Sequence, residues 1–162
     1  MQTNDIVNDL KEVLQGDVSI EETDLELNAR DTSLFYLKPS IVVYPKDTKD
    51  VQSLVSYVSK KKDEGVNISL TGRSAGTDMT GGPLTQSIVV SFTKYMNNML
   101  ELSDTEAKAE VGMFYRDFEK ETLGKKGWIM PSYPASRELC AIGGIVSNNS
   151  GGEKTLVYGK TE

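Results

Sequence analysis

A strand–helix–strand pattern restricts the fold of this sequence more than any other feature. Residues 41–44 form an unbroken apolar run, Ile-Val-Val-Tyr, as expected for a strand that is covered on both faces. Asp47 or Thr48 can cap the following helix, because a short polar side chain there accepts hydrogen bonds from free backbone N–H groups. Apolar residues recur along one side of this helix at Val51, Leu54, Val55 and Val58. Residues 66–70 then alternate as a second strand would, which predicts a βαβ unit with a parallel pair and a right-handed crossover.

The remainder of the chain alternates between short predicted elements of both kinds. Apolar residues at helical spacing, with Gly16 as a stop, predict a short amphipathic helix near the start, followed by an irregular acidic segment. Further strands are expected at residues 87–92, 99–102 and 107–111, and a further helix at 114–123. The pattern predicts an α+β fold, with an N-terminal helix and acidic segment at 1–31 and a domain at 32–162.

Charge and composition exclude several functions. The chain has 18 basic and 24 acidic side chains, a net charge of −6, so the basic face of a nucleic-acid-binding protein is not expected. The sequence contains no histidine, so no imidazole base or histidine metal ligand is available within it, and we expect no metal site. No run approaches the roughly 20 apolar residues of a membrane span, and the start lacks the pattern of a signal peptide.

The single cysteine, Cys140, excludes an internal disulfide framework. This suits a reducing compartment, so a cytoplasmic location is expected. Cys140 itself has three interpretations: a reactive thiol, a covalent link to a cofactor, or a small buried residue. The sequence favours the last of these.

The first glycine-rich segment, residues 72–82, follows the second strand of the βαβ unit directly. The carboxyl ends of parallel strands are where open α/β sheets bind ligands. Glycines let the main chain approach a phosphate, and successive backbone N–H groups then form an anion nest. Arg73, Ser74 and Thr77 add a positive charge and two hydroxyl donors. The alternative is a tight glycine-rich turn that binds nothing, because neither of the common phosphate-binding motifs is present.

A second glycine-rich block spans residues 143–152. Residues 142–149 are expected to form a short helix whose N-terminus begins at two glycines, and such an end attracts anions. The alternative is that these glycines only allow close packing of the helix against a sheet. Two unlike glycine-rich segments in one chain favour a long ligand with more than one polar region, such as a dinucleotide.

Six motifs occur in the order found in one known family. They are Pro39-Ser-Ile-Val-Val-Tyr-Pro45, Thr71-Gly-Arg-Ser-Ala-Gly-Thr77 with Gly81-Gly82, Pro131 to Ser136, Ile142-Gly-Gly144, Asn149-Ser-Gly-Gly152 and Tyr158-Gly-Lys-Thr161. The chain thereby resembles the N-terminal FAD-binding domain of FAD-linked oxidases, of the PCMH or vanillyl-alcohol oxidase type. Within that family it is most similar to the D-2-hydroxy-acid dehydrogenases, which act on D-lactate, glycolate or D-2-hydroxyglutarate.

The resemblance implies a PCMH-type fold, in which two α+β subdomains sandwich an extended FAD. The βαβ unit would belong to the first subdomain, and the chain would include only the beginning of the second. We therefore expect a fragment of a longer enzyme, inactive alone, that lacks the remainder of the flavin domain and the cap domain. The full enzyme would oxidise a small hydroxy acid by hydride transfer to FAD and pass electrons to an acceptor that the sequence does not identify.

The family match also implies the cofactor-binding residues. The pyrophosphate would lie in the cradle formed by Arg73, Ser74, Ala75, Gly76, Thr77 and Asp78. The remainder of the flavin would contact Pro131, Ser136, Gly143, Gly144, Asn148, Gly151, Gly152 and Tyr158. Thr77 stands where covalently flavinylated relatives have a histidine, so FAD is expected to bind without a covalent link. No catalytic residue is assigned.

Asp78 departs from what a phosphate site needs. Its carboxylate would weaken anion binding unless it points away or caps a neighbouring N–H group.

Judged from the residues alone, the competing function is a non-enzymatic nucleotide- or phosphate-binding α/β module.

Overall fold

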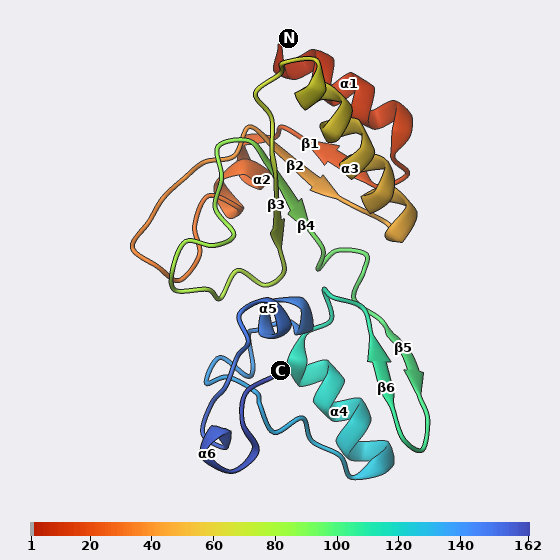
Figure 1. The fold of residues 1–162 in the computed structure, drawn as a ribbon, viewed down its shortest axis with the longest axis vertical. Coiled ribbons are helices and arrows are strands. Elements are labelled where there is room, and N and C mark those ends of the chain that lie inside the picture. Colours follow the sequence, from red (N-terminus) through yellow and green to blue (C-terminus); the bar gives the residue numbers. More distant parts are fainter. Residues whose placement is uncertain (1) are drawn as a thin grey trace.

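The computed structural model describes residues 2–162 and contains two units, each with its own core. The first is built on a four-stranded sheet in the order β1-β2-β4-β3 (Figure 1). Strands β2 (Ile41–Tyr44), β4 (Ile88–Ser91) and β3 (Leu70–Arg73) are parallel. Strand β1 (Asp17–Ser19) is antiparallel to β2 at the edge of the sheet.

The predicted pairing within the βαβ unit is wrong in one respect. Strands β2 and β3 do not pair with each other, because β4 lies between them and pairs with both. The apolar side chains of β4, Ile88, Val89 and Val90, are almost completely buried, which suits the central position of a parallel sheet. The second strand also begins at Leu70 rather than at residue 66, since its ladder with β4 starts at the Leu70–Ile88 pair.

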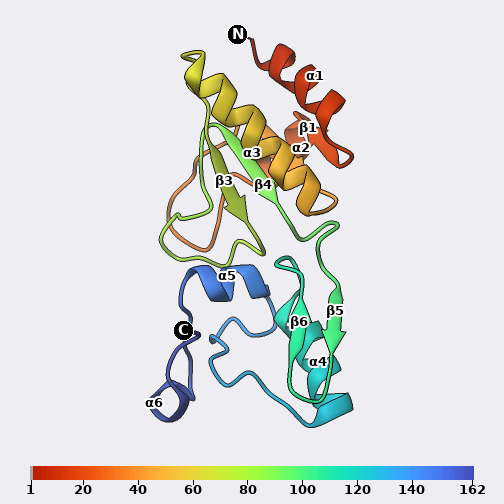
Figure 2. The same cartoon turned by 45° about the vertical axis from the view of Figure 1, so that its right-hand side comes forward.

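Two helices cover one face of this sheet (Figure 2). They are α1 (Thr3–Val13) and α3 (Thr48–Asp63), which lie side by side. Their buried side chains join those of the sheet in one core, namely Val7, Leu10, Leu14, Val18, Ile41, Val43, Leu54, Val58, Ile68, Ile88 and Val90. The predicted cap is present, because the Asp47 carboxylate accepts hydrogen bonds from the N–H groups of Lys49 and Asp50.

The acidic segment after α1 is not irregular as expected. It forms β1 and then the short helix α2 (Glu22–Leu27), which contacts β2. The buried carboxylate of Asp50 fixes the start of this segment, since it accepts hydrogen bonds from the N–H groups of Gln15 and Gly16 at 2.9 and 2.8 Å. Residues 17–19 are thereby aligned with β2. The early residues thus share a core with the sheet, and the division of the chain after residue 31 stays a prediction.

The second unit begins with the expected hairpin of β5 (Met99–Leu102) and β6 (Ala107–Ala109). Helix α4 (Tyr115–Lys126) follows and ends at Gly127, whose φ of 68° is left-handed. Two short helices, α5 (Ile142–Ser147) and α6 (Thr155–Tyr158), complete the chain. The core of this unit contains Met113, Tyr115, Phe118, Tyr133, Cys140 and Ile145.

No helix within residues 2–162 combines the length and the apolar character needed to cross a membrane.

Candidate functional site

The two glycine-rich segments meet where the two units of the fold join. In both views, α5 lies directly beside the loop that leaves β3 (Figures 1 and 2). The backbone carbonyl of Val111 links the two segments. It accepts a hydrogen bond from the Ser74 hydroxyl at 3.1 Å and another from the Gly143 N–H at 2.7 Å. Two segments far apart in the sequence are therefore held against each other.

The backbone N–H groups of the first loop are largely unpaired. Within residues 2–162, those from Ala75 to Met79 donate to no protein acceptor. The carbonyl of Asp78 is engaged instead, because it accepts the Thr32 N–H at 3.0 Å. The single hydroxyl proton of Thr32 lies within reach of the Thr77 and Asp78 carbonyls, at 3.1 and 2.8 Å. Successive unpaired N–H groups are the donors that an anion nest requires.

Gly76 permits this loop conformation. Its φ is +69°, a backbone geometry that residues with a Cβ rarely adopt. A Cβ at this position would also lie 2.2 Å from Nη2 of Arg73. The backbone angle therefore favours glycine here, and a side chain would also force the end of the Arg73 side chain to move.

Arg73, which is expected from the sequence to supply a positive charge, is partly buried. It belongs to the end of β3, and its Nη2 donates to the backbone carbonyl of Arg30 at 2.8 Å. Burial lowers the pKa of its guanidinium. The other terminal nitrogen, Nη1, is buried and has no hydrogen-bond partner among the described residues. Such an orphaned donor costs about 1–3 kcal/mol, and an anionic ligand or a water molecule would relieve that cost.

Asp78 meets the condition that the sequence set for it. Its Oδ2 accepts hydrogen bonds from the N–H groups of Thr80 and Gly82 at 3.0 and 2.8 Å, and its Oδ1 accepts one from the Asn148 amide at 3.0 Å. Partial burial opposes ionisation, but these hydrogen bonds outweigh it and lower the pKa of Asp78 below its usual value. The carboxylate is thus engaged by donors other than the free N–H groups of residues 75–79.

The N-terminus of α5 is less open than the sequence predicts. Its first two N–H groups are not free, because Ile142 donates to the carbonyl of Met113 and Gly143 to that of Val111. A Cβ at Gly143 would lie 2.8 Å from both Ser74 Oγ and the Val111 carbonyl oxygen. Close packing, the alternative interpretation, is therefore what Gly143 provides. Gly144 is more open, since a Cβ there would come no nearer than 3.9 Å to Ser74.

Of the other residues predicted to contact the flavin, one lies beside the first loop, one packs against the backbone and one lies away from the loop. Asn148 lies beside the first loop through its contact with Asp78. Gly152 has a packing role, since a Cβ there would lie 2.2 Å from the carbonyl oxygen of Tyr133. Tyr158 is 63% exposed on α6, which lies away from α5 and the first loop in both views (Figures 1 and 2). The structure therefore does not bring Tyr158 to the loop.

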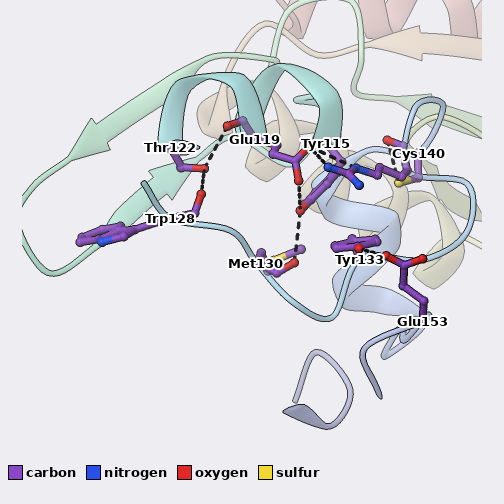
Figure 3. A network of polar contacts seen from close by, with 9 residues as sticks. Tyr115, Glu119, Thr122, Trp128, Met130, Tyr133, Cys140 and Glu153 are labelled. Atoms are coloured by element: carbon purple, nitrogen blue, oxygen red, sulfur yellow. Dashed lines mark hydrogen bonds and ion pairs between the residues drawn. The ribbon is translucent and has the colours of Figure 1, made fainter. Parts of the chain in front are cut away.

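Pro131 and Ser136 lie on the connection between α4 and α5, which a polar network holds in place (Figure 3). Glu119 on α4 is central to this network. Its carboxylate accepts from Arg137 at 2.5 and 3.1 Å, and it accepts from the Tyr115 hydroxyl at 3.0 Å. Burial, followed by the nearby Glu119 carboxylate, raises the pKa of Tyr115, so its hydroxyl stays protonated.

Further along the same connection, the Tyr133 hydroxyl donates to Glu153 (Figure 3). Cys140 is 3% exposed, and burial raises the pKa of its thiol. The thiol is therefore a small buried group with little thiolate character, the interpretation that the sequence favours.

The sequence reasoning missed the segment that supports the first loop from the other side. The Asp31 carboxylate accepts the N–H of Gly81 at 2.9 Å, and Thr32 donates to the backbone carbonyls of Thr77 and Asp78. Phe35 packs against Gly81. One local signal was available, since Asp31 also accepts the N–H of Ser33 in a turn typical of aspartate.

Comparison with known proteins identifies relatives of this chain. Among curated proteins, the chain is similar to D-2-hydroxyglutarate dehydrogenase of Escherichia coli (strain K12), with 27% identity, covering 96% of this chain and 16% of that protein. It is also similar to glycolate oxidase subunit GlcD of Bacillus subtilis (strain 168), with 29% identity, covering 80% of this chain and 27% of that protein. The chain thus spans well under half the length of these relatives.

Solved structures agree on the fold. An alkyldihydroxyacetonephosphate synthase superposes with a TM-score of 0.82 at 21% identity, covering 99% of this chain and 32% of the other. A p-cresol methylhydroxylase superposes with a TM-score of 0.74 at 17% identity, covering 91% and 29%. The expected PCMH-type fold is therefore confirmed. The FAD binding domain family matches residues 39–162, which is most of the sequence, and the chain belongs to that family.

Proposed function

We propose that this chain is the flavin-binding part of an oxidoreductase that oxidises a D-2-hydroxy acid and transfers a hydride to FAD. The observation that supports this most directly is the run of unpaired N–H groups from Ala75 to Met79, beside the orphaned Nη1 of Arg73. The family match supplies the cofactor, and the relatives named above supply the substrate class. Because the chain spans a third or less of those relatives, substrate oxidation is assigned to the whole protein.

The residues present fit a pyrophosphate. The N–H groups of residues 75–79 would hold its oxygens, and the buried guanidinium of Arg73 would add a positive charge behind the loop. Gly144 and Ser136 would contact the more distal parts of the flavin, as would Pro131 and Gly151. FAD, when bound, is the group that accepts the hydride. Within this chain, the residues bind and orient the cofactor.

No residue of this chain is proposed as the base that removes the substrate proton. Such a group must reach the substrate hydroxyl and have a pKa near the working pH. The sequence has no histidine, and none of the carboxylates described above stands free in the site. We propose that the base and the substrate-binding residues lie outside residues 1–162, as does the contact with the electron acceptor.

We also propose that FAD binds without a covalent link to this chain. Histidine is absent, and the thiol of Cys140 is buried with a raised pKa, which disfavours the nucleophilic thiolate. Acid precipitation of the flavin-loaded protein is expected to leave free FAD in the supernatant. A flavin-modified peptide mapped to residues 1–162 would contradict this.

A titration with FAD followed by substrate tests the function. The full protein is expected to bind FAD and to bleach its visible absorbance on addition of one of D-2-hydroxyglutarate, D-lactate or glycolate. The isolated chain is expected to bind FAD more weakly than about 1 μM, corresponding to about −8 kcal/mol, and to show no bleaching. Flavin binding by the full protein without bleaching by any hydroxy acid would favour a different substrate class. Binding of nucleotides without any flavin preference would favour the non-enzymatic module.

A cytoplasmic location is proposed as well. Its support is compositional, because the only cysteine is buried and unpaired, as is common in reducing compartments. Fractionation of the source cells with an antibody against this chain tests it. Recovery in a membrane or extracytoplasmic fraction would contradict it.

A further inference from the structure

We infer that the side chains of Asp78 and Asn148 form a clasp that fixes the two glycine-rich segments relative to each other, and that these two side chains position the segments rather than contact the flavin. The role of this clasp in cofactor binding rests on the proposed function. The inference goes beyond the family match, which implies that residue 78 belongs to the pyrophosphate cradle and that Asn148 lines the remainder of the flavin, but gives neither side chain a part in holding the two segments together. The observation behind it is the direct hydrogen bond from the Asn148 amide to Asp78 Oδ1, at 3.0 Å.

Asp78 is the point at which three segments of the chain meet. Its backbone carbonyl accepts hydrogen bonds from the N–H and the hydroxyl of Thr32, at 3.0 and 2.8 Å. Its Oδ2 accepts from Thr80 and Gly82 on its own loop. Its Oδ1 reaches Asn148, which directly follows the last residue of α5. No other hydrogen bond between side chains joins the first loop to the second block within residues 2–162.

The donors around Asp78 also explain how a carboxylate is tolerated beside an anion site. Its negative charge is shared among two backbone N–H groups, a hydroxyl and an amide, and such charge-assisted bonds are roughly twice as strong as neutral ones. The N–H groups from residues 75 to 79 are separate from these and remain available. Asp78 therefore shapes the loop without filling its nest.

An elongated cofactor gains from such a clasp. A ligand that contacts both segments binds tightly only if their separation is already correct, because ordering two mobile segments on binding costs affinity. The Ser74–Val111–Gly143 contact fixes the segments at the start of α5, and Asp78–Asn148 fixes them at its end. Two contacts at opposite ends of one helix set both distance and angle.

Exchanging the two side chains provides the test. In the double variant Asp78→Asn with Asn148→Asp, the new amide oxygen at position 78 can accept from Thr80 and Gly82. The NH₂ of the same amide donates to the new carboxylate at position 148, so every hydrogen bond is kept. In Asn148→Asp alone, two carboxylates face each other within hydrogen-bond distance and repel. Asn148→Ala removes the contact without adding charge. Ser147→Asp is the matched control, since it adds a charge at the neighbouring exposed position.

Two measurements are made on each variant: the dissociation constant for FAD, and hydrogen–deuterium exchange of residues 74–82 without FAD. We expect Asn148→Asp to weaken FAD binding at least tenfold and to accelerate exchange in the loop. The exchanged pair should return both values to within about threefold of the wild-type protein, as the control should. If the exchanged pair is as impaired as Asn148→Asp, or if Asn148→Asp has no effect, the inference is wrong.

The outcome also separates this inference from the proposed function. If the wild-type protein does not bind FAD, the proposed function fails. The exchange measurement still decides whether the clasp exists, because it needs no ligand. Rescue of loop protection by the exchanged pair supports the clasp, and absence of rescue contradicts it.

Discussion

Gly143 and Ser74 touch across the junction of the two units, so closely that a Cβ on residue 143 would lie 2.8 Å from the Ser74 Oγ. The same Cβ would lie 2.8 Å from the Val111 carbonyl oxygen, to which Ser74 donates. The side chain of Ser74 and the backbone of Val111 thus both pack against the Cα of Gly143. This contact holds the first loop against α5.

The first prediction concerns this contact. Gly143→Ala is expected to destabilise the protein by about 1–3 kcal/mol, because the added methyl overpacks a junction that contains backbone atoms. Gly124→Ala is the control, since nothing lies within 4 Å of its added methyl and alanine favours the helix by about 0.5–1 kcal/mol. Urea unfolding measures both. Equal stabilities of the two variants would show that the junction is looser than the structure indicates.

The second prediction separates backbone strain from steric conflict in the loop. Gly76 and Gly65 both have positive φ, at 69° and 83°, but only Gly76 has a neighbour within 4 Å. Gly65→Ala is expected to cost about 1 kcal/mol from the backbone angle alone. Gly76→Ala is expected to cost more, and also to weaken FAD binding at least tenfold, because Arg73 must move. If Gly76→Ala leaves the FAD affinity unchanged, the loop is not part of the FAD-binding site.

The third prediction concerns the buried carboxylate of Asp50. It accepts three backbone N–H groups, from Gln15, Gly16 and Lys46, at 2.8–2.9 Å. Asp50→Asn replaces one acceptor oxygen with a donor that faces an N–H group, so we expect a loss of about 2–3 kcal/mol. Asp63→Asn, at the exposed end of the same helix, is expected to change stability by less than about 0.5 kcal/mol. Thermal unfolding of both variants decides this.

The fourth prediction is a pH dependence. The pKa of Asp78 in the folded protein lies below its ordinary value of 3.8, so its ionised form stabilises the fold above that value. This stabilisation is lost as the pH falls through the lower folded value. The wild-type protein should therefore be more stable than Asp78→Asn at pH 6, and the difference should shrink towards pH 2. A difference that is constant over this range would mean that Asp78 is not ionised in the loop.

Local patterns in the sequence determined most of the secondary structure. The unbroken apolar run of β2, the capped amphipathic helix α3 and the hairpin of β5 and β6 all formed where predicted. These elements are set by side-chain periodicity and capping, which act over a few residues. The motif order likewise indicated the family that the comparison then confirmed.

Only the tertiary structure decided how these pieces pair and which groups remain free. The sequence could not place β4 between β2 and β3, because β2 and β4 are both apolar and both buried, and strand order depends on contacts between segments far apart in the chain. Nor could it show that Arg73 donates to Arg30, that the first N–H groups of α5 are occupied, or that Asp78 reaches Asn148. Each of these is a hydrogen bond between segments that lie far apart in the sequence. Which donors stay free for a ligand depends on partners that local sequence does not specify.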